Sequence, residues 1–242
     1  MLKGALALEL RLRATTRPTR DIDLGRDDNE QRAIEDITAA QQLALDDFFT
    51  FIAIRTDELD ATDEFAAVRF HLTAQLAGRT FEQFTLDIGF TDTIPARPDP
   101  IQTSDLLAFA GIDPIELPTL PLPQHLAEKV HAYTRSYGAS GRRSTRPKDL
   151  VDILLIATSE PIDAAALRSA LETTFSERQR QELPASLPTP PADWAAPYRR
   201  LATEVHVEPD LTAAYTAAAA FLAPILAGRA QGTWNPTQRS WS

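Results

Sequence analysis

The sequence of 242 residues contains no cysteine. This absence excludes disulfides, thiolate metal sites and thiol nucleophiles, and with them several classes of enzyme. No apolar run approaches the roughly 20 residues that a membrane-spanning helix needs. The first residues also lack the charged and then apolar pattern of a secretion signal. We therefore expect a soluble, cytoplasmic protein that has no membrane partner.

Basic residues are scarce as well. The chain has 24 Lys and Arg against 34 Asp and Glu, which gives a formal net charge of −10. Proteins that coat nucleic acid indiscriminately need many basic residues, because their binding depends on the release of counterions from phosphates. The charge therefore argues against such coating. Basic residues still gather in residues 11–20 and 135–148, so guidance of a nucleic acid at one site stays open.

Alternation of polar and apolar residues predicts strands in the first half of the chain. The predicted strands cover residues 21–24, 49–55, 68–76 and 84–88. Gly78 follows the third of them and predicts a hairpin turn. Helical spacing of leucine and alanine predicts a helix over residues 2–12, and the polar residues 27–29 offer caps for a helix that reaches about Phe48.

After Phe90 prolines become frequent, and they predict a connector from Pro95 to Pro123 with one short helix near Leu106. Beyond it the pattern is helical, apart from a proline-rich linker. The predicted helices cover residues 123–137, 147–158, 163–180 and 211–226, and the linker covers 184–197. We predict an α+β fold with a mixed β-sheet core and flanking helices in residues 1–118, followed by a helical domain in residues 119–242.

Three aspartates fall on predicted strands at positions that share one face. Side chains two residues apart in a strand point the same way, so Asp21 and Asp23 stand side by side, and Asp87 repeats the arrangement on another strand. Neighbouring carboxylates repel unless a cation lies between them, and hard oxygen ligands favour Mg²⁺ or Mn²⁺. Such a trio suits phosphoryl transfer with metal ions. The alternative is that these acids only face solvent.

Residues 2–12, followed by Arg17-Pro18-Thr19-Arg20-Asp21-Ile22-Asp23-Leu24, resemble the first motif of the AbiEii/AbiGii-type nucleotidyltransferase toxins, a family similar to the DNA polymerase β superfamily. The resemblance implies that Gly4, at the start of a helix, faces the nucleotide phosphates. The family usually has a glycine pair here, and this chain has Gly4-Ala5. The resemblance further implies that Asp21 and Asp23 are catalytic metal ligands, and that Arg17 and Thr19 contact the nucleotide.

Two later segments extend the resemblance. Glu128-Lys129-Val130-His131-Ala132 is similar to the family's Glu-Lys-x-His-Ala motif, and residues 146–152 are similar to its Arg-x-Lys-Asp-x-x-Asp motif. The resemblance implies that Lys129 contacts the triphosphate and that Asp149 completes the catalytic set. The remaining nucleotide-binding residues that it implies are Arg146, Lys148 and Asp152.

Each of these residues also has an ordinary structural interpretation. Asp149 follows Pro147 in the first turn of a helix, where the helix dipole favours an acid. Lys148 and Asp152 have the spacing of a surface salt bridge, and Lys129 could simply be exposed. We expect His125 and His131 to pack or cap, because no other histidine or cysteine completes a transition-metal set with them.

The predicted reaction transfers a nucleoside monophosphate from a nucleoside triphosphate to an acceptor and releases pyrophosphate. The resemblance implies the toxin of a toxin–antitoxin system, with an antitoxin encoded alongside and an RNA acceptor, the 3′ end of transfer RNA. Two alternatives stay open. One is a nucleotidyltransferase that acts on a small molecule or a protein hydroxyl, and the other is an inactive protein that only binds nucleotides or partners.

Overall fold

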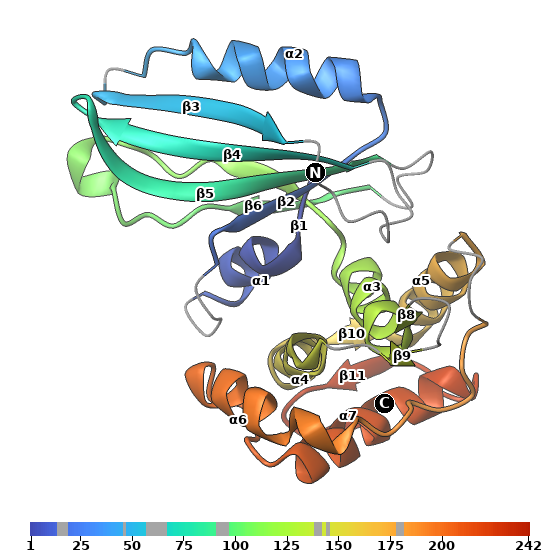
Figure 1. Ribbon diagram of the computed structural model, residues 1–242. Coiled ribbons are helices and arrows are strands. Elements are labelled where there is room, and N and C mark those ends of the chain that lie inside the picture. Colours follow the sequence, from blue (N-terminus) through green and yellow to red (C-terminus); the bar gives the residue numbers. More distant parts are fainter. Residues whose placement is uncertain are drawn as a thin grey trace. The chain divides into compact units, whose positions relative to one another are not determined.

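The computed structural model describes residues 1–13, 19–45, 47–56, 67–90, 97–137, 142–143, 146–177 and 182–242 (Figure 1). The chain divides into two compact units. The first contains Met1–Arg11 and Pro18–Leu120, and the second contains Leu12–Arg17 and Pro121–Ser242.

The described part of the first unit is built on a mixed sheet of seven strands in the order β3-β4-β5-β2-β1-β7-β6. The strands are β1 (Leu2–Lys3), β2 (Asp21–Arg26), β3 (Phe49–Thr56), β4 (Ala67–Leu76), β5 (Arg79–Phe90), β6 (Asp99–Gln102) and β7 (Glu116–Thr119). β2 runs parallel to β5, and β1 runs parallel to β7. The other neighbouring strands are antiparallel. This arrangement confirms the predicted α+β class.

One face of the sheet is apolar and is covered by a helix. α2 (Glu30–Gln41) begins at Asn29, whose side chain accepts a hydrogen bond from the Arg32 N–H. Figure 1 shows α2 lying along β3. The core under it joins residues of α2 to alternate residues of the strands: Ala33, Ile34, Ile37, Ile22, Leu24, Val68, Phe70, Leu72, Leu86, Ile88 and Phe90. Since strand side chains alternate, the intervening residues of β2, β4 and β5 form the opposite, polar face.

The predicted hairpin is confirmed. β4 and β5 pair along their length and are joined by Ala77 and Gly78, which have φ values of 48° and 77°. A two-residue hairpin turn whose twist matches that of the strands requires a positive φ at both of its residues.

α1 (Gly4–Leu12) follows β1 directly and is anchored at its far end. Arg11 donates hydrogen bonds to Asp99 Oδ2 at 2.8 Å and to the Leu120 carbonyl at 3.2 Å. The Leu120 N–H donates to the Leu2 carbonyl at 2.8 Å. Both ends of α1 are therefore held to the sheet, and this fixes the position of Gly4 at the start of the helix.

Some predictions for the first unit are wrong in detail. The helix predicted to reach Phe48 ends at Gln41, and β1, β6 and β7 were not predicted. The short helix expected near Leu106 is one 3₁₀ turn, η1 (Ala108–Ala110). Prolines in residues 95–123 favour a connector, but Pro100 and Pro118 lie in the antiparallel pair of β6 with β7. β6 is an edge strand, where a missing N–H is tolerated.

The second unit is mainly helical. Its helices are α3 (Leu122–Thr134), α4 (Pro147–Ser159), α5 (Ala164–Glu177), α6 (Ala195–Glu204) and α7 (Leu211–Leu226), and a 3₁₀ turn, η2 (Ala192–Trp194), precedes α6. α3 packs on α4 and α5, and α4 packs on α6 and α7. Fully buried side chains that form this core include Leu126, Val130, Leu150, Ile153, Leu167, Leu171 and Leu222.

The second unit also contains strands that the helical prediction omitted. β10 (Ile162–Asp163), β11 (Thr233–Asn235) and β12 (Ser240–Trp241) form a small sheet, and β8 (Ser136–Tyr137) pairs with β9 (Arg142–Arg143). α6 lies partly in the predicted linker, because Pro197 falls in the first turn of the helix, where proline is tolerated. The predicted helix over 211–226 is confirmed as α7. No helix in the described ranges is both long and apolar enough to cross a membrane.

Candidate active site

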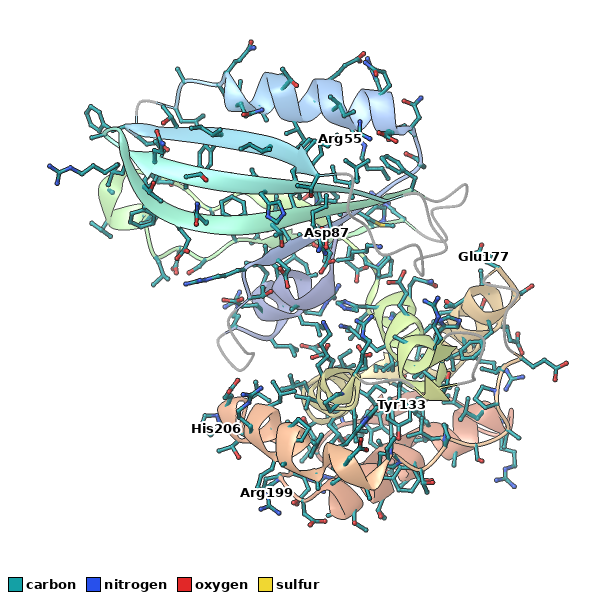
Figure 2. All side chains as sticks on the ribbon, in the orientation of Figure 1. Arg55, Asp87, Tyr133, Glu177, Arg199 and His206 are labelled. Atoms are coloured by element: carbon teal, nitrogen blue, oxygen red, sulfur yellow. The ribbon has the colours of Figure 1, made fainter. Side chains whose placement is uncertain are left out.

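The three aspartates lie in two neighbouring strands on the polar face of the sheet. In the parallel pairing of β2 with β5, Asp21 stands opposite Thr85, and Asp23 stands opposite Asp87. Opposed residues of paired strands share a face. Figure 2 shows Asp87 on the side of the sheet away from α2, whereas Arg55 lies on the α2 side. The prediction that the three carboxylates share one face is therefore confirmed.

Asp21 is oriented by two threonines. The Thr85 hydroxyl donates a hydrogen bond to Asp21 Oδ1 at 2.6 Å. The Thr19 hydroxyl accepts from the Asp21 N–H at 3.1 Å and donates to the Asp21 carbonyl at 3.3 Å. Thr19 thus fixes the start of β2, and its predicted contact with a nucleotide remains a prediction. Arg17 lies outside the described residues.

Asp23 lies against the first residue of α1. Gly4 has a φ of 68°, in the left-handed region. A Cβ on Gly4 would lie 1.8 Å from Asp23 Oδ2, a distance at which two atoms cannot coexist. Glycine is therefore required here both by the backbone and by the carboxylate beside it. The resemblance had implied only a phosphate contact for Gly4, and the close approach of Asp23 is an additional reason for this residue.

Asp87 has a partner that sequence reasoning missed. Arg69 stands opposite Asp87 in the β4–β5 pairing, and its Nε and Nη2 donate to the two carboxylate oxygens of Asp87 at 2.6 Å each. Hydrogen bonding to Asp87 raises the pKa of the Arg69 guanidinium, and the charges of Asp21 and Asp23 act in the same direction. Arg69 therefore lies within the field of all three carboxylates.

The donor set fits a hard divalent cation in part. Asp21 and Asp23 offer carboxylate oxygens on one face, and the space at Gly4 lets the Asp23 carboxylate approach the helix start. Oxygen ligands of this kind suit Mg²⁺ or Mn²⁺. Across the described ranges, however, no three His, Cys, Asp or Glu side chains are grouped closely enough to hold a metal ion. Since Arg69 engages both oxygens of Asp87, a third ligand role for Asp87 remains a prediction.

The second unit contains a separate buried ionic cluster. Lys129 of α3 contacts Asp152 Oδ2 at 2.6 Å and Asp149 Oδ1 at 3.9 Å, and Arg146 Nε contacts Asp149 Oδ2 at 3.0 Å. The side chains of Asp149 and Lys129 are 0% and 11% exposed. The ordinary interpretation that Lys129 is simply exposed is therefore wrong. Lys129 of α3 pairs with Asp152 of α4. Lys148 is half-buried beside this cluster in α4.

Burial and charge oppose each other in this cluster. Burial lowers the pKa of the Lys129 ammonium, but the charges of Asp152 and Asp149 outweigh it, so this pKa lies above its ordinary value. Burial raises the pKa of the Asp149 carboxyl, and the positive charges of Lys129 and Arg146 only partly counter this. Asp149, Asp152 and Lys129 are thus held together in a poorly solvated interior, where each depends on the others, and the partly exposed Arg146 adds a second cation from the edge.

The two histidines of α3 are buried. The rings of His131 and Phe175 meet edge to face with centroids 5.0 Å apart, so the predicted packing role of His131 is confirmed. His125 is 1% exposed and lies one helical turn before Lys129.

We predict that Gly4→Ala reduces nucleotide transfer about 100-fold, because the new methyl group displaces the Asp23 carboxylate from the position that a metal ligand needs. Gly78→Ala is a matched control. Gly78 also has a positive φ, of 77°, but a Cβ there meets no atom within 4 Å. Both variants should lose about 1–2 kcal/mol of stability to left-handed strain, and Gly4→Ala should lose more because its methyl group also displaces the Asp23 side chain. Initial transfer rates and thermal unfolding separate the two effects, and equal transfer rates would contradict the role of Gly4.

Comparisons with known proteins identify the family and agree with the fold. The family model described as "Nucleotidyl transferase AbiEii toxin, Type IV TA system" matches residues 1–224. Among solved structures, MenT4, a nucleotidyltransferase toxin from Mycobacterium tuberculosis H37Rv, is similar in fold, with a TM-score of 0.53 and 18% sequence identity. The match covers 96% of this chain and 85% of that one. No curated protein matches.

Proposed function

Because the chain belongs to the AbiEii family of nucleotidyl transferase toxins of type IV toxin–antitoxin systems, we propose that it transfers a nucleoside monophosphate from a nucleoside triphosphate to the 3′ end of transfer RNA. The family establishes a nucleotidyltransferase toxin, and it implies a nucleoside triphosphate substrate and an antitoxin partner. The transfer RNA acceptor, the site residues, the metal and a cytoplasmic place of action belong to the proposal. The observation that carries it is the pair of carboxylates, Asp21 and Asp23, on one face of β2.

We assign the metal to Asp21 and Asp23. A bound Mg²⁺ or Mn²⁺ ion would neutralise charge on the triphosphate and lower the pKa of the attacking hydroxyl. Thr85 holds Asp21 by its hydrogen bond at 2.6 Å. Because Gly4 has no side chain, the Asp23 carboxylate has room to lie beside the start of α1. Asp87 is retained as a third ligand that Arg69 would have to release.

In the second unit, Lys129 and Asp149 are the proposed catalytic pair. Asp152 holds the Lys129 ammonium at 2.6 Å, which fixes a point charge of the kind that binds phosphate. Arg146 contacts Asp149 through Nε, and its side chain is 41% exposed, so a ligand in solution can reach the guanidinium. Asp152 and Lys148, together with Gly4, Arg17 and Thr19 of the first motif, complete the proposed nucleotide contacts.

The alternative acceptor is a small molecule or a protein hydroxyl. The net charge of −10 favours it, because a polyanionic acceptor is repelled by a chain of like charge. The two acceptors leave the label on different molecules, so one experiment separates them.

The test incubates the protein with Mg²⁺, each α-³²P-labelled nucleoside triphosphate in turn and total transfer RNA. The matched control is the same RNA after periodate oxidation, which destroys the terminal 2′,3′-diol. We expect label in the intact RNA and none in the oxidised RNA. Label on protein would support the alternative acceptor, and the absence of any label with all four nucleotides would contradict transfer to RNA.

A further inference from the structure

Lys3 stands in the same row of residues as the carboxylates. In the antiparallel pairing of β1 with β2, Lys3 is opposite Asp23, and Asp23 is in turn opposite Asp87 in β5. Arg69 of β4 continues the row. Four neighbouring strands thus present a cation, two carboxylates and a second cation on one face of the sheet.

The side chain of Lys3 runs across the sheet over two glycines. Gly25 of β2 and Gly89 of β5 stand opposite each other, two residues beyond Asp23 and Asp87 and on the same face. Lys3 Cδ is 3.9 Å from the place of a Cβ on Gly25, and Lys3 Nζ is 3.3 Å from the place of a Cβ on Gly89. The ammonium therefore lies above β5, next to the carboxylate row, where Gly89 has no side chain. Over Gly25 the side chain of Met1 also lies close, with its Cε 3.7 Å from the place of a Cβ. We call Gly25 and Gly89 the glycine floor.

The two cations of the row differ in their partners. Arg69 forms a bidentate ion pair with Asp87. In contrast, within the part of the chain that the structure describes, no carboxylate lies within 4.0 Å of Lys3 Nζ. The side chain of Lys3 is half-buried. A half-buried ammonium with no carboxylate in direct contact keeps its hydrogen-bond donors available for an anion from solution.

We propose that Lys3 and the glycine floor bind a phosphate group of the nucleoside triphosphate, at the part that leaves as pyrophosphate. This inference rests on the proposed function. A pyrophosphate carries several negative charges, and one ammonium donates up to three hydrogen bonds to such oxygens. The absence of a side chain at Gly89 leaves room beside the ammonium, so the phosphate approaches the sheet closely there.

The experiment measures binding of inorganic pyrophosphate by titration calorimetry in the presence of EDTA, so that no metal contributes. We expect Lys3→Met to weaken this binding about 10-fold, which is the loss of one charged hydrogen bond, and Lys3→Arg to restore most of it. Arg79→Met is the matched control. It removes an exposed cation at the start of β5, and it should leave the affinity unchanged.

A second variant tests the geometry without removing the charge. Gly89→Ala places a methyl group 3.3 Å from Lys3 Nζ, which forces the ammonium to move by a few tenths of an ångström. We expect the KM for nucleoside triphosphate to rise several-fold with little change in kcat, as for a lost ground-state contact. A purely structural Lys3 would instead show a lower Tm and unchanged affinity for pyrophosphate.

The outcomes separate this inference from the proposed function. Wild-type affinity for pyrophosphate in Lys3→Met, in a protein that still labels its acceptor, would overturn the phosphate role of Lys3 alone. Failure of the wild-type protein to bind pyrophosphate in EDTA would also overturn the phosphate role of Lys3 alone, whereas failure to bind or transfer any nucleotide with Mg²⁺ present would overturn the proposed function as well. Loss of pyrophosphate binding in Lys3→Met, with restoration by Lys3→Arg, would support the inference even if the acceptor is not RNA.

Discussion

Replacement of either Asp21 or Asp23 with asparagine is expected to reduce nucleotide transfer by about 10³-fold or more, because the metal loses a charged ligand worth several kcal/mol of transition-state stabilisation. The fold should persist. In Asp21→Asn, the amide oxygen of the new side chain would still accept the hydrogen bond that the Thr85 hydroxyl donates to Asp21 Oδ1. In the absence of metal, the loss of one negative charge beside another should leave Tm unchanged or slightly higher.

Calorimetry with and without Mg²⁺ and nucleotide tests this assignment independently of the reaction. A ligand that binds the folded state raises Tm according to its concentration relative to Kd, so the wild-type protein should gain stability on addition and both variants should gain far less. Glu35→Gln is the control. It removes an exposed carboxylate from α2, which covers the other face of the sheet. Near wild-type transfer by either aspartate variant would show that the metal is assigned to the wrong residues.

The polar face could be predicted because a strand has a period of two. That period alone puts Asp21 with Asp23, and in β5 it places Asp87 between the inward-facing residues Leu86 and Ile88. The register that sets Asp23 opposite Asp87 is a property of the folded sheet. The partner Arg69 was missed for that reason, although its place among the polar residues of β4 was a usable signal. A pairing across strands cannot be derived from one strand's pattern.

Lys3 and the role of Gly4 were beyond prediction for a different reason. β1 has only two residues, too few to show alternation, so nothing in the sequence indicated that Lys3 faces Asp23. The motif identified Gly4, but the contact with Asp23 Oδ2 depends on a helix that begins directly against β2. Both features are set by chain segments that meet only after folding.

One helix boundary was predicted wrongly. The helix expected to reach Phe48 ends at Gln41, whose side chain accepts a hydrogen bond from the Ala53 N–H at 2.8 Å. Leu43 and Leu45, which lie in the predicted extension, are 66% and 67% exposed. Without burial, helical propensity alone gives too little energy to continue a helix. Tertiary contacts therefore decided this boundary.

The largest stability effect is expected from Lys129→Met, which leaves Asp152 without the ammonium at 2.6 Å and Asp149 with Arg146 alone. Removing one partner of a buried ion pair costs about 3–5 kcal/mol, so Tm should fall by about 10 °C or more. Arg199→Met, which removes an exposed cation of α6 (Figure 2), should change stability by less than about 0.5 kcal/mol.

The effect of pH provides the sharper test of the same cluster. The pKa of Asp149 is already raised by burial, and loss of the Lys129 charge should raise it further. An acid with a raised folded-state pKa destabilises the protein when ionised, and stability is regained as pH falls through that pKa. The deficit of Lys129→Met should therefore shrink from pH 7 to pH 5. Adding Asp152→Asn to Lys129→Met should also reduce the stability deficit, because Asp149 is then the only carboxylate of the cluster that has lost the Lys129 charge.

Tryptophan fluorescence during urea unfolding measures this deficit in the second unit alone, because the three tryptophans of the chain, Trp194, Trp234 and Trp241, all belong to that unit. A coupling of about 1–3 kcal/mol between Lys129→Met and Asp152→Asn would demonstrate the ion pair. Additive losses, or a deficit that is the same at pH 5 and pH 7, would mean that the ammonium of Lys129 does not neutralise these carboxylates. The proposal that this cluster positions Lys129 to bind a phosphate would then be wrong.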